Sequence, residues 1–323
     1  MIFDDVHSVI LDDIFLRLDG FRPGDDVFLK LEGLNPAGSI KIKTAVALVA
    51  SVENGQPLPY GTPLIESSSG NLGVALSVVC AAKRYRLTIV TDVNTTPSAV
   101  STMRALGTEV IVVDEPDPMG GFLHTRINTI RRMLAADPRL VWFNQYANPA
   151  NKQAHRDTTA ASMYANLGHS DVWVVGVGTA GTLMGLLEFK RAHGLRTTVV
   201  AVDAAGSVTF GGPPGRRHIP GLGASRRPEL YEDAGDFERV VVSEPETIEV
   251  CRLVARRYGL VVGGSTGSVL AAARRLECGA PGKRIAVVSP DMGEKYLNSI
   301  YSDSWVQNRY SASDHIISES VNV

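Results

Sequence analysis

Short apolar runs alternate with helical patterns along almost the whole of this 323-residue chain. Runs rich in Val and Ile predict strands at residues 27–31, 64–66, 87–91, 110–113, 141–144, 172–177, 197–202, 240–242 and 285–288. Helical stretches separate most of them, including residues 70–83, 96–106, 122–136, 153–167 and 181–193. Because parallel strands need crossover helices that cover both faces of a sheet, this alternation predicts an α/β fold with mostly parallel sheets.

Composition excludes several other classes of protein. A hydrophobic content of 44% with 20% charged residues is ordinary for a globular enzyme, and the length allows two domains. A net charge of -2 argues against a nucleic-acid partner, and no apolar run is long enough to span a membrane. The acidic start MIFDDVHSVILDD lacks the features of a signal peptide, so we expect a cytoplasmic protein.

Cysteine spacing bears on metal and disulfide chemistry. Cys80, Cys251 and Cys278 lie far apart and form no C-x-x-C pair. Neither a disulfide framework nor a metal site is therefore predicted. Each cysteine is expected to be a small buried apolar residue.

The stretch LNPAGSIK follows the first predicted strand and contains the first candidate catalytic residue. Pro36 biases Asn35 away from helical geometry and ends the strand, and Ser39 is predicted to be the N-cap of the next helix. This places Lys41 in the first helical turn, at the mouth of a strand-to-helix crevice. A desolvated lysine can lose its proton and attack a carbonyl to form a Schiff base, although most lysines are solvated surface charges.

Two further loops at strand ends offer sites for anions. In ESSSGNLG, residues 66–73, three hydroxyls, a glycine and an amide precede a helix and could receive a carboxylate, or could simply cap the helix. In VVGVGTAGT, residues 174–182, a glycine-rich turn could close around a phosphate. The same turn matches G-x-G-x-x-G, and Asp203 lies 22 residues after Gly181, so a dinucleotide-binding alternative stays open.

A fourth loop, VVGGSTGS at residues 261–268, precedes an alanine-rich helix. It could form a second anion cradle, or Ser265 could donate a hydrogen bond to a buried ring nitrogen. Helix capping would explain a single serine equally well.

These loops together resemble the cysteine synthase family, the fold-type II enzymes that depend on pyridoxal 5'-phosphate (PLP). NPAGSIK resembles the family's N-P-x-x-S-x-K box, SSSGN its substrate loop, GTAGT its phosphate loop and GGSTGS its pyridine loop. PDMGEKYL, residues 290–297, resembles its closing P-D-x-G-E-x-Y-L segment. Five matches in the family's order make the resemblance specific from about Leu16 to Trp305.

The resemblance implies an architecture. Two three-layer αβα domains are expected: a larger PLP-anchoring domain of residues 1–44 and 151–323, and a smaller mobile domain of residues 45–150 with the substrate loop. A homodimer is also implied, as are small-molecule amino-acid substrates.

The resemblance also assigns roles to single residues. Lys41 is expected to hold PLP in a Schiff base and then to remove and return the substrate α-proton. Asn71 is expected to bond the phenolic oxygen of PLP, and Ser265 to face its pyridine nitrogen. The loop expected to wrap the phosphate consists of Gly178, Thr179, Ala180, Gly181 and Thr182. The substrate α-carboxylate is expected at Ser68, Ser69 and Gln145.

The implied reaction is a β-replacement on an activated serine through an aminoacrylate intermediate. Departures from the family pattern narrow the subfamily. Sulfhydrylases usually read S-x-K-D-R, whereas Ile42 and Lys43 follow Lys41 here, and Leu72 replaces the second threonine of their T-S-G-N-T loop. The usual I-G-N-T-P is present only as LDDIF, residues 11–15.

GGFLHTRI, residues 120–127, and WFNQY, residues 142–146, resemble the branch of N-(2-amino-2-carboxyethyl)-L-glutamate synthases. Enzymes of that branch, which serve 2,3-diaminopropionate and siderophore biosynthesis, join O-phospho-L-serine to L-glutamate. Arg126 is the first candidate for the substrate phosphate, and Tyr146 could shape the nucleophile pocket or be a packed aromatic. Arg216, Arg217, Arg226 and Arg227 could form a basic rim, or could be solvated surface charges.

Three alternatives remain open on the sequence alone. The first is a cysteine synthase that uses sulfide with O-acetylserine or O-phosphoserine. The others are an NAD-binding Rossmann protein and a catalytically silent binding partner on the same fold.

Overall fold

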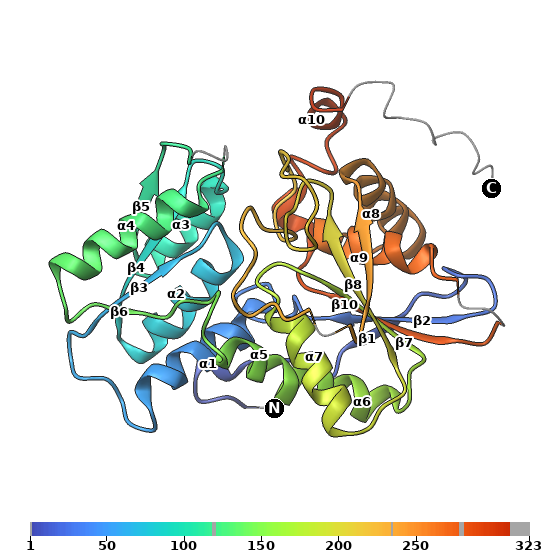
Figure 1. Ribbon diagram of the computed structural model, residues 1–323, viewed down its shortest axis with the longest axis horizontal. Helices are drawn as coiled ribbons and strands as arrows, with labels where there is room; N and C mark the ends of the chain where they lie inside the picture. The colour runs from blue at the N-terminus through green and yellow to red at the C-terminus, as the bar shows by residue number, and fades with distance from the viewer. Residues whose placement is uncertain (1, 118–120, 234, 278–280, 311–323) are drawn as a thin grey trace.

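Two sheets form the frame of the molecule and lie side by side in Figure 1. The computed structural model describes residues 2–117, 121–233, 235–277 and 281–310. One sheet has the order β1-β2-β10-β7-β8-β9, and the other has the order β5-β4-β3-β6. Every pairing is parallel except that of β1 with β2. The predicted α/β fold with mostly parallel sheets is therefore confirmed.

The strands agree with the predicted runs to within a few residues. The six strands of the larger sheet are β1 (Phe15–Arg17), β2 (Asp26–Leu31), β7 (Val172–Gly176), β8 (Thr198–Ala204), β9 (Glu238–Val242) and β10 (Arg284–Ser289). The four strands of the smaller sheet are β3 (Pro63–Ser67), β4 (Arg86–Asp92), β5 (Glu109–Val113) and β6 (Val141–Trp142). The sequence did not predict β1, because a three-residue edge strand is too short to show alternation.

Helices connect the strands, as the alternation predicts. They are α1 (Lys41–Glu53), α2 (Asn71–Lys83), α3 (Pro97–Ala105), α4 (Leu123–Ala136), α5 (Ala150–His155), α6 (Ala161–Leu167), α7 (Gly181–Ala192), α8 (Glu244–Tyr258), α9 (Gly264–Arg274) and α10 (Asp303–Gln307). Short 3-10 turns lie at η1 (Val6–Ser8) and η3 (Gly293–Tyr296). The helix predicted over residues 153–167 contains a π-helical turn, η2 (Arg156–Ala160), between α5 and α6.

Side-chain alternation along the strands builds a core on each face of the larger sheet. In β10, Ile285 and Val287 pack in the core under α8 and α9, and Ala286 and Val288 pack in the core under α7. The smaller sheet is likewise covered on both faces, by α1 to α3 on one side and α4 on the other. Both sheets are thus the middle layers of αβα sandwiches.

Helix α1 links the two sheets. Ile40, just before it, packs in the core of the larger sheet, whereas Ile42 packs in the core of the smaller one. The helix is continuous across the predicted domain limit at residues 44 and 45. That limit, and the one at residues 150 and 151, stay predictions.

Two further expectations concern cysteines and membranes. Cys80 and Cys251 are buried free thiols, and burial raises the pKa of each to about 12, so both are inert. Cys278 lies outside the described residues. Within the described part of the chain no helix has the length and apolar character needed to cross a bilayer. The cytoplasmic location stays a prediction.

Candidate active site

Lys41 is the first residue of α1, at the point where the chain passes between the two sheets. The asparagine of the NPAGSIK box fixes this turn: the Asn35 side chain donates to the carbonyls of Glu32 (2.8 Å) and Ser39 (3.0 Å). The backbone N–H of Ile40 donates to the Pro290 carbonyl at 2.7 Å. The start of α1 is thus tied to the loop that follows β10.

The prediction that Ser39 caps this helix is wrong. The capping position is Ile40, and the Ser39 hydroxyl lies 3.4 Å from the Lys41 N–H, too far for a strong bond. Ser39 instead forms an isolated antiparallel bridge with Asp291, which keeps its backbone extended for one residue more than the sequence suggested.

The environment of Lys41 favours the neutral amine. Burial lowers the pKa of the Lys41 ammonium from 10.5 to about 8, because desolvation penalises the charged form. Among the described residues, no hydrogen bond or ion pair involves its Nζ. The nearby His155 imidazole is fully buried, and desolvation and the Lys41 charge hold its pKa well below the usual range. A lysine of this kind can act as a nucleophile and a base near neutral pH.

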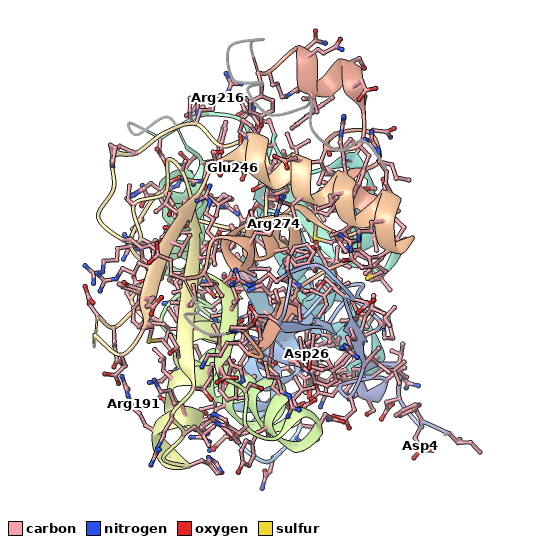
Figure 2. The ribbon with its side chains drawn as sticks, turned by 90° about the vertical axis from the view of Figure 1, so that its right-hand side faces the viewer. Asp4, Asp26, Arg191, Arg216, Glu246 and Arg274 are labelled. Carbon is pink, nitrogen blue, oxygen red and sulfur yellow. The ribbon has the colours of Figure 1, made fainter. Side chains whose placement is uncertain are left out.

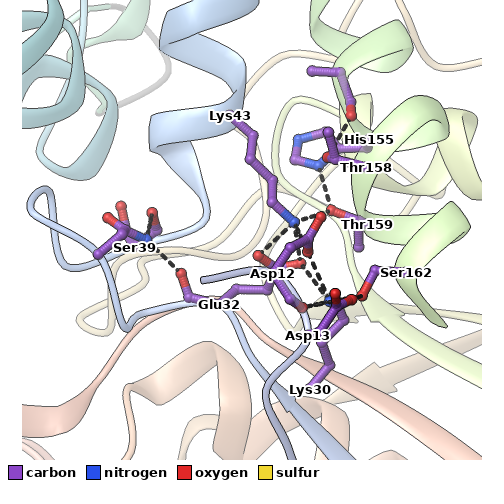
Figure 3. A network of polar contacts seen from close by, with 12 residues as sticks. Asp12, Asp13, Lys30, Glu32, Ser39, Lys43, His155, Thr158, Thr159 and Ser162 are labelled. Atoms are coloured by element: carbon purple, nitrogen blue, oxygen red, sulfur yellow. Dashed lines mark hydrogen bonds and ion pairs between the residues drawn. The ribbon is translucent and has the colours of Figure 1, made fainter. Parts of the chain in front are cut away.

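Lys43, two residues further on, points into a different environment, a buried charge cluster of Asp12, Lys30, Glu32 and Lys43 (Figure 3). Its Nζ lies 2.5 Å from Asp12 Oδ1 and 2.8 Å from both carboxylate oxygens of Glu32. It also donates to Thr159 Oγ1 at 3.1 Å. Of the two residues that depart from the sulfhydrylase pattern, Ile42 therefore lies in the core of the smaller sheet and Lys43 in this charge cluster, where the partners that the described residues offer its Nζ belong to the same chain.

The serine loop leads from β3 into α2. Ser68 Oγ accepts hydrogen bonds from the backbone N–H groups of Gly70 (3.2 Å) and Gly73 (2.8 Å), so its hydroxyl supports the helix start. Ser69 is exposed and makes no hydrogen bond through its hydroxyl among the described residues. Asn71 begins α2 and reaches across to the larger sheet's side, where its Nδ2 donates to Asp291 Oδ2 at 2.8 Å.

The glycine loop between β7 and α7 forms a cradle of backbone amides. Ala180 has φ 68°, a left-handed conformation that turns the chain into the helix. Among the described residues, the amides of Thr179, Gly181 and Thr182 donate to no protein group, as is usual for the first turn of a helix. Such amides, with the helix dipole, suit a phosphate.

Asn151, which the sequence did not single out, joins this cradle to the helix of Lys41. Its Nδ2 donates to Thr179 Oγ1 at 3.0 Å and to the Gln145 carbonyl at 2.8 Å, and its Oδ1 accepts from Thr44 Oγ1 at 3.2 Å. A Cβ on Gly181 would lie 2.2 Å from the same oxygen, so only glycine fits there. The NPAN sequence before α5 offered no signal for this role beyond its polarity.

Ser265 is the second residue of α9 and is buried. Its hydroxyl makes no hydrogen bond among the described residues; a Cβ on Gly221 would lie 3.1 Å from it, and a Cβ on Gly178 of the cradle would lie 3.4 Å from the Gly221 carbonyl oxygen. The structure thus brings Ser265 next to the predicted phosphate loop. Asp203 is buried and accepts from the Ala204 N–H at 2.9 Å, with Arg217 nearby, which does not favour the ribose-binding alternative.

A second group of polar residues lies at the carboxyl ends of the smaller sheet's strands. Arg126, in the first turn of α4, is 6% exposed, and its Nε lies 3.2 Å from Asp92 Oδ2. Neither its Nε nor its Nη1 has a hydrogen-bond partner among the described residues. Arg126 is therefore not a solvated surface charge, because α4 carries it into the protein, and its role as the phosphate receptor stays a prediction.

Glu66 completes this group, and neither it nor Asp92 was predicted from the sequence. Its carboxyl is fully buried and accepts from the N–H groups of Ser67 (2.7 Å) and Gln145 (3.1 Å) and from Trp142 Nε1 (3.2 Å). Desolvation nevertheless raises its pKa from 4.5 to about 7, against the opposing effect of those bonds and of Arg126. Burial also raises the pKa of Tyr146, whose phenol feels the Arg126 charge. We call Glu66, Asp92, Arg126 and Tyr146 the substrate-side cluster.

Three of the four arginines of the predicted basic rim have contacts within the chain. Arg217 donates to the Gly206 carbonyl and, at 3.1 Å, to Ser225 Oγ. Arg226 pairs with Glu229, and Arg227 stacks on Tyr231. Arg216 is exposed on the outer edge of the molecule in Figure 2. The structure therefore does not gather these four charges into one receptor.

Comparison with known proteins identifies the family to which this chain belongs. The family model described as "Pyridoxal-phosphate dependent enzyme" matches residues 15–291. The chain is 42% identical over 274 residues to the N-(2-amino-2-carboxyethyl)-L-glutamate synthase of Ralstonia nicotianae. The aligned region covers 83% of this chain and 80% of that protein. The chain is 39% identical, with the same coverage, to the synthase of that name from Cupriavidus metallidurans.

Solved structures with a similar fold superpose on nearly the whole of this chain. O-ureido-L-serine synthase matches with a TM-score of 0.86 and 28% identity, covering 94% of this chain and 98% of that one. An O-acetylserine dependent cystathionine beta-synthase from Helicobacter pylori matches with a TM-score of 0.85 and 26% identity, covering 94% of this chain and 100% of that one.

Proposed function

Because the chain belongs to the pyridoxal-phosphate dependent enzyme family, we propose that it joins L-glutamate to O-phospho-L-serine to give N-(2-amino-2-carboxyethyl)-L-glutamate. The chain is a PLP-dependent enzyme that catalyses β-replacement. What supports the finer proposal is the 42% identity to a synthase named for this product. The product would serve as a precursor of 2,3-diaminopropionate.

The residues around Lys41 fit PLP. The phosphate would bind to the amides of residues 178–182, which have no other acceptor among the described residues. Asn71 would donate to the phenolic oxygen, and the unpaired Ser265 hydroxyl would face the ring nitrogen. When bound, PLP supplies the electron sink for breaking the α-C–H bond and the bond to the β-leaving group.

Lys41 carries the proton chemistry of the proposal. With a pKa of about 8, a substantial fraction of its Nζ is neutral near pH 7.5 and can bond to the cofactor aldehyde. Once substrate has displaced it, the same amine can take the α-proton and later return it. Ser265, unlike a carboxylate, would not hold a proton on the ring nitrogen, which favours prompt elimination.

Substrate recognition is assigned to the serine loop and the substrate-side cluster. The exposed Ser69 hydroxyl and Gln145 would receive the α-carboxylate, with Ser68 shaping the loop as the acceptor for two of its amides. Arg126 would receive the leaving phosphate through Nη1, which has no partner among the described residues. Tyr146 would lie beside it.

One assay tests the proposal. Purified enzyme with PLP is given O-phospho-L-serine and either L-glutamate or sulfide, and the products are identified by mass. We expect N-(2-amino-2-carboxyethyl)-L-glutamate in the glutamate reaction. Cysteine as the only product would instead identify a cysteine synthase. A colourless protein without a borohydride-sensitive lysine adduct would favour the catalytically silent alternative.

We also propose that the protein forms a homodimer, as the family resemblance implies. Sedimentation velocity at several protein concentrations measures the mass of the particle directly. A monomer at all concentrations would remove this part of the proposal.

A further inference from the structure

Asp291 joins three loops that carry predicted cofactor-facing residues. Its backbone bridges Ser39, two residues before Lys41. Its carbonyl accepts from the Gly263 N–H at 3.2 Å, two residues before Ser265. Its Oδ2 accepts from Asn71 Nδ2 at 2.8 Å. No other described residue makes contacts of this kind with all three loops.

The Asp291 side chain is held firmly from the larger sheet's side. It is fully buried, and Tyr296 donates to the same Oδ2 at 2.6 Å. A Cβ on Gly263 would lie 1.9 Å from Oδ1, so this oxygen occupies space that only glycine leaves open. Oδ1 itself has no hydrogen-bond partner among the described residues. A buried carboxylate oxygen without a partner is costly, which is typical of a functional site.

Lys295 fixes the other end of the Asn71 amide. Its Nζ donates to Asn71 Oδ1 at 2.8 Å and lies 3.4 Å from the carbonyl oxygen of Gly38 in the NPAGSIK box. An ammonium only donates and a carboxylate only accepts. The two neighbours therefore allow a single orientation of the amide, with the nitrogen toward Asp291.

In this orientation one N–H of Asn71 donates to Asp291, and the Tyr296 hydroxyl, whose pKa the Asn71 amide lowers against the larger effect of burial, also lies close to the amide. The amide nitrogen has two hydrogens, and Asp291 accepts one of them. If the amide were reversed, its oxygen would face the carboxylate and its nitrogen the ammonium, and both contacts would be repulsive. Asp291 thus leaves the second N–H of the amide to other acceptors at the first turn of α2.

We propose that Asp291 and Lys295 are positioning residues that orient the Asn71 amide so that its Nδ2 donates to the phenolic oxygen of PLP. This inference rests on the proposed function and adds two residues to its site. Both residues lie beyond β10, whereas Asn71 begins a helix of the smaller sheet, so the contact also holds the two sides of the site together.

The test uses the full chain with Asp291→Asn, Lys295→Gln and Asn71→Ala. Matched controls are Asp303→Asn, an exposed residue paired with Arg252, and Lys190→Gln on the last turn of α7. The dissociation constant for PLP and the visible absorbance maximum of the bound form are measured, and circular dichroism checks folding. We expect Asp291→Asn and Lys295→Gln each to weaken PLP binding about tenfold and to shift the maximum, with neither control doing so.

A double substitution separates positioning from a merely structural role. If Asp291 acts through Asn71, adding Asp291→Asn to Asn71→Ala changes neither the affinity for PLP nor the spectrum further. Fully additive effects, or wild-type affinity and spectrum in both single variants, would overturn the proposal. If Asp291→Asn does not fold, the test uses Lys295→Gln at its exposed position instead, with the same measurements of PLP affinity and absorbance, alone and combined with Asn71→Ala.

Failure of the proposed function has a different signature. If the unaltered chain binds no PLP, the proposed function falls and this inference falls with it. If the unaltered chain binds PLP but Asp291→Asn and Lys295→Gln match it, only the positioning role is lost.

Discussion

Two buried groups of charges, one built on β2 and α1 and the other at the ends of β3 and β4, differ in how completely their charges are paired. In the buried charge cluster, Lys43 has two carboxylates and a hydroxyl within 3.1 Å, and Lys30 lies 2.8 Å from Asp12 Oδ1 (Figure 3). In the substrate-side cluster, Arg126 has one carboxylate at 3.2 Å and two nitrogens without a hydrogen bond among the described residues.

This difference indicates that the buried charge cluster is structural, whereas the substrate-side cluster can bind an anion. A buried charge whose partners are complete has no capacity left for a ligand and stabilises only the fold around it. A buried guanidinium with free N–H groups retains the capacity to bind an anion, at a cost to the stability of the empty protein. The raised pKa of Glu66 in the substrate-side cluster is a second sign that its charges are not fully compensated.

The largest expected effects distinguish two lysines in the first turn of α1: Lys43, which belongs to the fully paired buried charge cluster, and Lys41, whose Nζ has no polar partner among the described residues. Lys41→Ala should lower turnover by at least about a thousandfold, because it removes both the covalent anchor and the proton carrier. The midpoint of thermal unfolding should not fall, since no hydrogen bond or ion pair of Lys41 Nζ is lost among the described residues. Turnover is followed by product mass. Retention of the borohydride-sensitive adduct in this variant would exclude Lys41 as the anchor.

Lys43→Met should show the reverse pattern. Among the described residues the substitution leaves Lys30 as the one cation that compensates Asp12 and Glu32, and it should lower the free energy of unfolding by about 3 kcal/mol. The visible spectrum of bound PLP should stay that of the unaltered enzyme. Denaturant unfolding measures the first effect and absorbance the second. A changed spectrum with unchanged stability would mean that Lys43 belongs to the active site.

The sequence singled out the glycine loops more readily than the acidic residues of the substrate-side cluster, for a physical reason. Backbone cradles need glycine at fixed spacings, so GTAGT and GGSTGS are visible as patterns, and Val- and Ile-rich strands fix their order at the sheet edge. Glu66 and Asp92 are ordinary acidic residues near strand ends, and only the pairing of β3 with β4 and the packing of α4 brings them to Arg126.

Smaller misses have local causes. Ser39 looked like a helix cap because its residue type is right, but its bridge with Asp291, 252 residues away, decides its backbone. Asp291 was visible within PDMGEKYL as part of a motif. Its contacts with Asn71 and Gly263 depend on tertiary structure, which the local pattern does not encode.

Arg126→Met tests whether the incompletely paired cluster is a receptor. The variant keeps much of the side-chain volume and should raise the KM for O-phospho-L-serine about 10- to 100-fold, because a charge-assisted contact to the phosphate is lost. The KM for an uncharged donor such as O-acetylserine should change far less. Steady-state kinetics with both donors measures how much the substitution changes each KM, and the ratio of the two changes isolates the contact to the phosphate.

Arg132→Met is the matched control for that experiment. Arg132 is exposed on the same helix and bonds only to Thr129 among the described residues. It should leave both KM values unchanged. An equal effect of Arg126→Met on the two donors would take Arg126 out of the phosphate site.

The last prediction is a pH dependence of stability that comes from Glu66 in the substrate-side cluster, opposite in sign to the one that the lowered pKa of Asp12 gives the buried charge cluster. Burial raises the pKa of Glu66 in the folded protein from its usual 4.5 to about 7, so the folded protein binds the proton more tightly than the unfolded chain does. The stability that protonated Glu66 contributes is therefore fully present below pH 4.5 and is lost as the pH rises through about 7, a loss of about 3 kcal/mol in total.

The variant Glu66→Gln tests this, because its amide cannot titrate. It should flatten the fall in unfolding free energy between these pH values, whereas Glu238→Gln, at an exposed position, should not. Urea unfolding at a series of pH values measures the slope, which is independent of any constant cost of the amide. An unchanged slope in Glu66→Gln would mean that the pKa of Glu66 is the same in the folded and unfolded protein, which would remove this sign that the charges of the substrate-side cluster are incompletely compensated.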